Sequence, residues 1–153
     1  MRNLEHPVAA LYKFVPDAEK NNPAVSSVPA GWHIAHALMV IIKITEALAH
    51  SDPERYAWKF NLPRVLAFTL NRFPRGRARA PESVKPDMSR TTDFEALFVQ
   101  AGHAIEKLKN LHPDQHFVHP VFGMLNKKNT FIMLDIHTRH HLAIIQDIVS
   151  SNA

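Results

Sequence analysis

The sequence predicts an all-α fold, most simply an antiparallel four-helix bundle with a short extra helix and long loops, in a single domain of residues 1–153. Three observations predict this fold. Apolar residues recur at helical steps in several segments, and no alternation of polar and apolar residues is long enough for a strand. A chain of 153 residues also has the length of one domain with a substantial hydrophobic core, which a helical bundle requires.

Proline and glycine delimit the helices expected in the first half of the chain. A short helix is expected from Val8 to about Val15, where Pro16 interrupts the pattern. The strongest pattern spans Trp32–His50. A further helix fits Leu62–Phe73, with Pro63 tolerated in its first turn.

Two loops and two helices are expected in the second half. Arg75–Arg90 has two proline-delimited pieces and no apolar period, which is typical of a loop. Thr92 is suited to cap the next helix, whose apolar positions extend to Leu108. Leu111–Leu125 is expected to form a second loop, and the last helix runs from about Lys127 to Val149.

The composition points to chemistry in one respect only, since the chain has 11 histidines and no cysteine. The absence of cysteine excludes a disulfide framework, a thiolate nucleophile, an iron–sulfur cluster and a cysteine-based zinc finger. A metal bound by this chain would therefore have nitrogen and oxygen ligands, and any thiol chemistry would use an external thiol.

The net charge of +4 is local, because residues 71–90 contain six basic and two acidic residues and the rest of the chain is balanced. A solvated loop is one interpretation. The other is an anion-binding site formed by Arg75, Arg77 and Arg79, since guanidinium groups bind carboxylates with paired hydrogen bonds. A nucleic-acid binder usually spreads its basic residues over a face or a helix, so no nucleic-acid partner is expected.

No targeting or membrane segment is expected. The N-terminus lacks the long apolar region of a signal peptide. The longest apolar run, Ala37–Ile42, ends at Lys43 and is far shorter than the roughly 20 residues that span a bilayer. A soluble cytoplasmic protein without membrane contact is therefore expected.

Two histidines lie on the apolar face of the last predicted helix. At roughly 100° per residue, His137 and His141 are about 40° apart at the centre of the apolar stripe. The opposite side is expected to carry Asp135, Arg139 and Gln146. A buried ring nitrogen without a partner costs about 1–3 kcal/mol, so both rings need one. A metal ion would serve both, because this spacing directs the rings to one point, and hydrogen bonds to buried backbone, threonine or water are the alternative.

A third metal ligand would come from another helix. Of the histidines in the Trp32–His50 helix, His36 fits the apolar face best. His33 is expected to face solvent in the first turn. The second loop offers three further candidates for this ligand, which are otherwise expected at the surface: His112, His116 and His119. Thr138 occupies the place of the glutamate in the zinc-protease motif, so that class is disfavoured.

The Gly31–His36 segment at the start of a helix, and the run His119-Pro120-Val121-Phe122-Gly123-Met124-Leu125 before a helix with His137, His140 and His141, resemble the DinB/YfiT-like superfamily. More narrowly, they are similar to a branch described only as a domain of unknown function. The resemblance covers the chain from about Trp32 to its end.

The resemblance implies an antiparallel four-helix bundle in which three histidines bind a divalent metal, often zinc or nickel. His137 and His141 match the two late ligands of the family. Val40 stands where the family has its first ligand, and His36 lies one turn earlier. Either His36 substitutes for that ligand, or this chain has lost a competent metal site and kept the scaffold.

Characterised relatives of this superfamily include thiol-dependent S-transferases and a maleylpyruvate isomerase. The resemblance thus implies a metal-dependent transferase or hydrolase that uses an external thiol or water on a small-molecule substrate. The alternative is a non-catalytic bundle with a degenerate metal site, which binds a small molecule or a protein partner, including a second copy in a homodimer.

Overall fold

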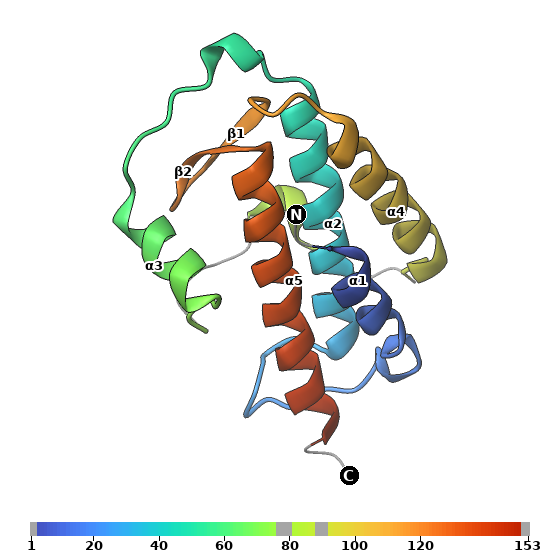
Figure 1. Cartoon of the computed structure of the whole chain (residues 1–153). Helices are drawn as coiled ribbons and strands as arrows, with labels where there is room; N and C mark the ends of the chain where they lie inside the picture. Colours follow the sequence, from blue (N-terminus) through green and yellow to red (C-terminus); the bar gives the residue numbers. More distant parts are fainter. Residues whose placement is uncertain (1–2, 76–80, 88–91, 151–153) are drawn as a thin grey trace.

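The computed structural model describes residues 3–75, 81–87 and 92–150. Within these ranges the chain is mostly helical, as the sequence predicts (Figure 1). The α-helices are α1 (Glu5–Tyr12), α2 (Ala30–Ala49), α3 (Leu62–Leu70), α4 (Phe94–Asn110) and α5 (Lys127–Ser150). Short 3-10 turns occur at Val15–Asp17, Pro53–Arg55 and Glu82–Val84, and two strands are formed by β1 (His116–His119) and β2 (Gly123–Asn126).

The core is built around α2, which packs along both α4 and α5. Ile34, Leu38 and Ile41 of this helix have no exposed surface. Figure 1 shows that α2 and α5 run in opposite directions, with α4 on the other side of α2. The short α1 lies across α4 and α5. The antiparallel arrangement of α2 and α5 brings the first turns of α2 beside the second half of α5.

The prediction of an all-α fold is wrong at one place, because β1 and β2 form an antiparallel hairpin within the expected loop Leu111–Leu125. His119 pairs with Gly123 at its closed end, and the His119 Nδ1 accepts hydrogen bonds from the backbone N–H groups of Val121 and Phe122, each at 3.1 Å. Gly123 has a φ of 69°, which favours glycine. Four-residue strands are too short for alternation to reveal them.

The hairpin also buries one of the histidines expected at the surface. His116 in β1 is only 9% exposed, so that expectation is wrong for this residue. Its backbone N–H donates a 2.8 Å hydrogen bond to the Ser51 hydroxyl, just after the end of α2. The ring of His119 stacks on Phe122, with ring centroids 4.5 Å apart. The contact with Ser51 holds the hairpin at the end of α2, and the ring stack lies within the hairpin turn.

The helix boundaries differ from the sequence predictions by a few residues. Asp93, rather than Thr92, caps α4, because its side chain accepts the backbone N–H of Ala96 at 3.0 Å. The first helix begins at Glu5, ahead of the expected start. The third helix ends at Leu70, and Asn71 follows it in the left-handed conformation.

Among the described residues, one helix is long and apolar enough to cross a membrane by length and composition, although Lys43 interrupts its apolar run. This helix is α2, whose most apolar 18-residue window has a mean hydropathy of 1.3. Because 56% of that window is buried inside the protein, α2 also has the character of a core helix.

The face of α5 that the sequence predicts to be exposed to solvent is partly covered by α1. Asp135 is 3% exposed, and its carboxylate lies 2.8 Å from the Arg139 Nε. Asn3 and His6 line the same surface hollow as these two residues. The expectation that Asp135 faces solvent is therefore wrong, because helical periodicity does not show where α1 packs.

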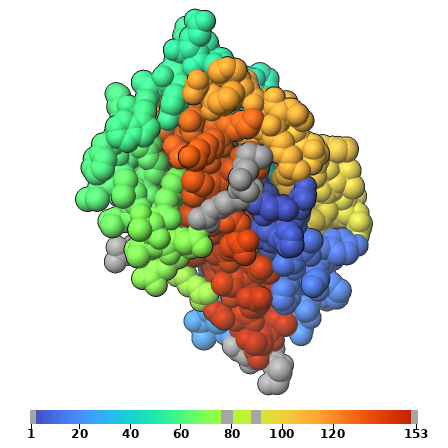
Figure 2. Space-filling model, viewed as in Figure 1, coloured from blue at the N-terminus to red at the C-terminus, as the bar shows by residue number. Residues whose placement is uncertain are grey.

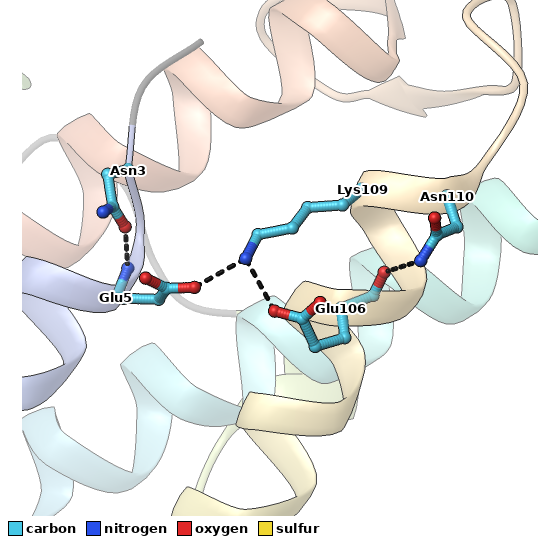
Figure 3. Close-up of polar contacts among 5 residues, drawn as sticks. All are labelled: Asn3, Glu5, Glu106, Lys109 and Asn110. Atoms are coloured by element: carbon cyan, nitrogen blue, oxygen red, sulfur yellow. Dashed lines mark hydrogen bonds and ion pairs between the residues drawn. The ribbon is translucent and has the colours of Figure 1, made fainter.

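Surface ion pairs of Lys109 connect α1 to α4. Figure 3 shows Lys109 of α4 between two carboxylates, that of Glu5 in α1 at 2.5 Å and that of Glu106 in its own helix at 2.6 Å. Figure 2 shows α5 along the centre of one face, with α1 on one side and the segment that contains α3 on the other.

Candidate metal centre

Three histidines from two antiparallel helices converge in the structure. His36 lies on α2, and His137 and His141 lie one turn apart on α5. Each offers one ring nitrogen, and these three atoms lie within 4.8 Å of one another. The ring centroids are 4.5 Å apart for His137 and His141, and 4.8 Å apart for His36 and His141. We call these three residues the histidine cluster.

The structure places His36, and not Val40, beside the two histidines of α5. Val40 is 5% exposed and belongs to the apolar core. His36, one turn earlier, is the residue that reaches the two histidines of α5.

Two contacts orient the ring of His36. Its Nδ1 donates a 2.7 Å hydrogen bond to the backbone carbonyl of Val84. Its ring stacks on Trp32, with centroids 4.8 Å and planes 14° apart. With the proton on Nδ1, a neutral His36 carries its lone pair on Nε2, which is the form that binds a metal.

His141 is held by a residue that the sequence analysis placed in solvent. His33 is only 5% exposed, and its Nδ1 lies 2.9 Å from the Nδ1 of His141. The expectation for His33 is therefore wrong, because α5 packs over the first turn of α2 and covers it. The three-residue spacing between His33 and His36 could have indicated the burial of His33, because it places both residues on one side of a helix.

His137 has a buried nitrogen without a partner. Its Nδ1 has no access to solvent and no hydrogen-bond acceptor or donor among the described residues. The neighbouring hydroxyl of Thr138 does not help, since it donates to the carbonyl of Leu134 at 2.8 Å. An unpartnered buried polar atom of this kind costs about 1–3 kcal/mol, which a metal ion bound to this nitrogen would offset.

Burial keeps the cluster neutral at neutral pH. Burial lowers the pKa of His36, and the hydrogen bond to the Val84 carbonyl opposes the shift. The pKa values of His137 and His141 lie well below the usual value, because of burial first and the charges of neighbouring histidines second. Neutral imidazole is the form that ligates metals, so the cluster does not have to lose protons before binding.

An aromatic ring lies against the α5 side of the cluster. The Phe73 ring centroid is 6.4 Å from that of His137 and 6.2 Å from that of His140. Phe122 of the hairpin turn lies 5.4 Å from Phe73. Apolar surroundings of this kind reduce the dielectric at a metal centre and limit the access of water.

The expected anion-binding residues are described only in part. Arg77 and Arg79 lie outside the described residues. Arg75 is half exposed and forms a 2.7 Å ion pair with Asp147 of α5. Its charge contributes to lowering the pKa of His140 and of His33, the hydrogen-bond partner of His141.

The histidine that follows the last residue of α2 does not join the cluster. The Nδ1 of His50 donates to the carbonyl of Glu46 at 2.7 Å, at the opposite end of the helix. The residues that the sequence analysis missed are thus His33, Trp32 and Val84, which hold the rings of the cluster rather than belong to it.

Three neutral imidazoles in this arrangement suit a divalent metal of intermediate softness. A tetrahedral zinc with Zn–N bonds of about 2.0–2.1 Å places its ligand nitrogens roughly 3.4 Å apart. The ring nitrogens of the cluster, which lie within 4.8 Å of one another, would have to approach by about 1.4 Å or less to reach that value. Three protein ligands would leave one position open, as in catalytic zinc sites.

No protein-family description matches the chain, and neither a curated protein sequence nor a solved structure matches it. The geometry of the histidine cluster is therefore the basis on which a function can be assigned.

Proposed function

We propose that this protein is a metal-binding helical bundle of the DinB/YfiT-like kind, in which His36, His137 and His141 hold one divalent metal ion, zinc or nickel. The observation that carries the proposal is the convergence of three ring nitrogens, from two helices, within 4.8 Å. Two of the rings are oriented by hydrogen bonds through Nδ1, and the third has a buried Nδ1 without a partner.

The donor set favours these metals over others. Imidazole nitrogen suits zinc and nickel, whereas magnesium and calcium prefer oxygen ligands. The chain has no cysteine, so a thiolate does not compete for the site. The apolar residues around the cluster would limit the access of water, which competes with the imidazoles for the ion.

The proposed activity is that of a metal-dependent transferase or hydrolase. A metal held by three histidines with one open position would polarise a substrate oxygen or lower the pKa of a bound water or thiol. Because the chain has no cysteine, a thiol would have to come from a small molecule. Phe73 and Trp32 would limit the access of bulk water to that position.

We also propose that Arg75 recognises an anionic group of this small molecule, together with Arg77 and Arg79. The side chain of Arg75 is half exposed, and its ion pair with Asp147 holds the guanidinium beside α5. The test is calorimetric titration of the zinc-loaded protein with mercaptoacetate, a thiol that carries a carboxylate. Replacing all three arginines by alanine is expected to weaken binding about 10-fold or more, because charge-assisted hydrogen bonds are lost. Unchanged affinity would exclude the anion site.

The competing function is a non-catalytic bundle in which the cluster is a buried polar network. The contacts of His36 with Val84 and of His141 with His33 satisfy part of the cluster without a metal. The unpartnered Nδ1 of His137 is the feature that this alternative leaves unexplained.

Metal analysis separates the two functions. The protein is purified without a histidine tag, and its zinc and nickel content and zinc affinity are measured, the latter against a chromophoric chelator. We expect one metal per chain, and alanine variants of His36, His137 and His141 that lose it. His103→Ala, which removes an exposed histidine of α4, is the matched control and should bind normally. A folded protein that takes up no zinc or nickel would rule out the metal site.

A further inference from the structure

A second pair of ring nitrogens meets behind the proposed metal ligand His141. The Nδ1 atoms of His33 and His141 lie 2.9 Å apart, and the other nitrogen of His33, Nε2, lies 2.9 Å from the Ser26 hydroxyl. Both histidines are buried, at 5% and 8% exposure. The three residues form a chain of hydrogen bonds that leads from the cluster to the loop before α2.

Only one of the two facing Nδ1 atoms can carry a proton in this contact, so two arrangements exist. In the first, His141 donates from Nδ1 and His33 accepts, so the proton of His33 is on Nε2 and is donated to the Ser26 hydroxyl. In the second, the Ser26 hydroxyl donates to His33, His33 donates to His141, and the proton of His141 is on Nε2.

The two arrangements differ in what they leave for a metal. His141 has its Nδ1 engaged by His33 in both, so Nε2 is the nitrogen that remains for ligation. In the first arrangement Nε2 carries a lone pair, whereas in the second it carries a proton and cannot ligate. The first arrangement repeats the pattern of His36, whose Nδ1 donates to the Val84 carbonyl.

We infer that His33 is a positioning residue: it accepts the Nδ1–H of His141 and thereby fixes the ring and tautomer that present Nε2 to the metal. Ser26 completes the chain by accepting the proton of the His33 Nε2. This inference rests on the proposed metal site. An outer partner of a ligating histidine usually contributes about 10–100-fold to metal affinity.

The packing of the helices explains how His33 comes to lie beside His141. The first turn of α2 lies beside His141 because α2 and α5 pack against each other in opposite directions. Trp32 has an edge contact with the His33 ring, with centroids 5.3 Å apart, and limits its rotation. Ser26 is half-buried and also accepts the backbone N–H of Val28 at 3.3 Å, which places its hydroxyl under His33.

The first test compares zinc affinities by chelator competition. His33→Leu is expected to weaken zinc binding by about 10–100-fold. His33→Gln is expected to recover most of that loss, because its side-chain oxygen can accept the same hydrogen bond. Ser26→Ala should lower the affinity by a smaller factor, and Ser27→Ala, at the exposed neighbouring position, should leave it unchanged.

The second test reads the tautomer directly and needs no variant. Long-range proton–nitrogen NMR of the zinc-loaded wild-type protein should show His141 bound through Nε2, with a proton on Nδ1 that is protected from exchange. If His33 only supported the fold, the proton of His141 would not be held on Nδ1 and ligation would not be confined to Nε2.

The outcomes distinguish the two proposals. If the wild type binds no zinc, the metal site and this inference both fail. If the wild type binds zinc but His33→Leu binds it equally well, or His141 ligates through Nδ1, the metal site stands and the role of His33 is overturned.

Discussion

Trp32 lies face to face with His36, with ring centroids 4.8 Å and ring planes 14° apart. The indole therefore covers one face of a proposed metal ligand, while the Val84 carbonyl holds the edge of the same ring. Of the two tryptophans in the chain, the other, Trp58, is 64% exposed. This difference makes tryptophan fluorescence a reporter of the cluster.

Nickel binding is expected to quench the fluorescence of Trp32, because an open-shell ion on the stacked imidazole would lie close to the indole. Titration of metal-free protein with Ni²⁺ should show saturable quenching with one equivalent. Trp58→Phe should keep this response, and Trp32→Phe should lose it. Equal quenching in Trp32→Phe would mean that nickel binds elsewhere on the chain.

His119 should make the stability of the protein sensitive to acid. Its pKa is lowered from 6.5 to about 4 by burial, and its Nδ1 accepts two backbone N–H groups of the hairpin turn. The unfolded chain therefore binds more protons between these pH values. The stability that His119 contributes is fully present above pH 6.5 and is lost as the pH falls to about 4, with a slope of up to about 1.4 kcal/mol per pH unit.

The matched variant is His119→Asn, whose side-chain oxygen can accept the same N–H groups but does not titrate. Urea unfolding of the metal-free wild type and variant is measured from pH 7 to pH 4.5. The difference in stability between them should change in favour of the variant as the pH falls. A constant difference across this range would show that His119 is not held neutral by the turn.

The positions of His137 and His141 could be predicted because both lie on one helix, where spacing alone determines which side chains share a face. The contact with His36 required only that α2 and α5 pack through their apolar stripes. The burial of His33 could not be predicted in the same way, since it depends on how far α5 extends over the first turn of α2. Asp135 was assigned to solvent for the corresponding reason, because the sequence pattern does not place α1.

The hairpin was missed for a different physical reason. Its strands have four residues each, and turn chemistry rather than alternation defines them. The acceptor role of the His119 Nδ1 and the positive φ of Gly123 produce the turn. The motif His-Pro-x-Phe-Gly carries the family resemblance, and its role in the turn is the more direct explanation of these residues.

Lys109 is expected to contribute a small, salt-sensitive part of the stability. Its ammonium group lies between the carboxylates of Glu5 and Glu106, and these contacts connect α1 to α4 (Figure 3). Exposed ion pairs are weak and are screened by salt. Lys109→Met should lower the urea midpoint slightly at low ionic strength, and the difference should vanish in about 1 M NaCl. Lys107→Met, on the same helix, is the control, and an equal effect of both would mean that only net charge matters.

Among the residues of α3 and the segments beside it, Arg64 should contribute most to the stability of the fold. Its side chain is 5% exposed, and its guanidinium donates to the backbone carbonyls of Lys59, Phe122 and Met124, which ties α3 to the hairpin. Arg64→Met leaves these carbonyls without their donor and should cost about 2–4 kcal/mol in urea unfolding. Arg64→Lys should cost nearly as much, because a single ammonium group cannot replace a planar fork that reaches three acceptors. Arg72→Met removes the same charge from an exposed site and should change stability by less than about 0.5 kcal/mol. If the lysine variant were as stable as the wild type, charge rather than the geometry of the guanidinium would hold α3 in place.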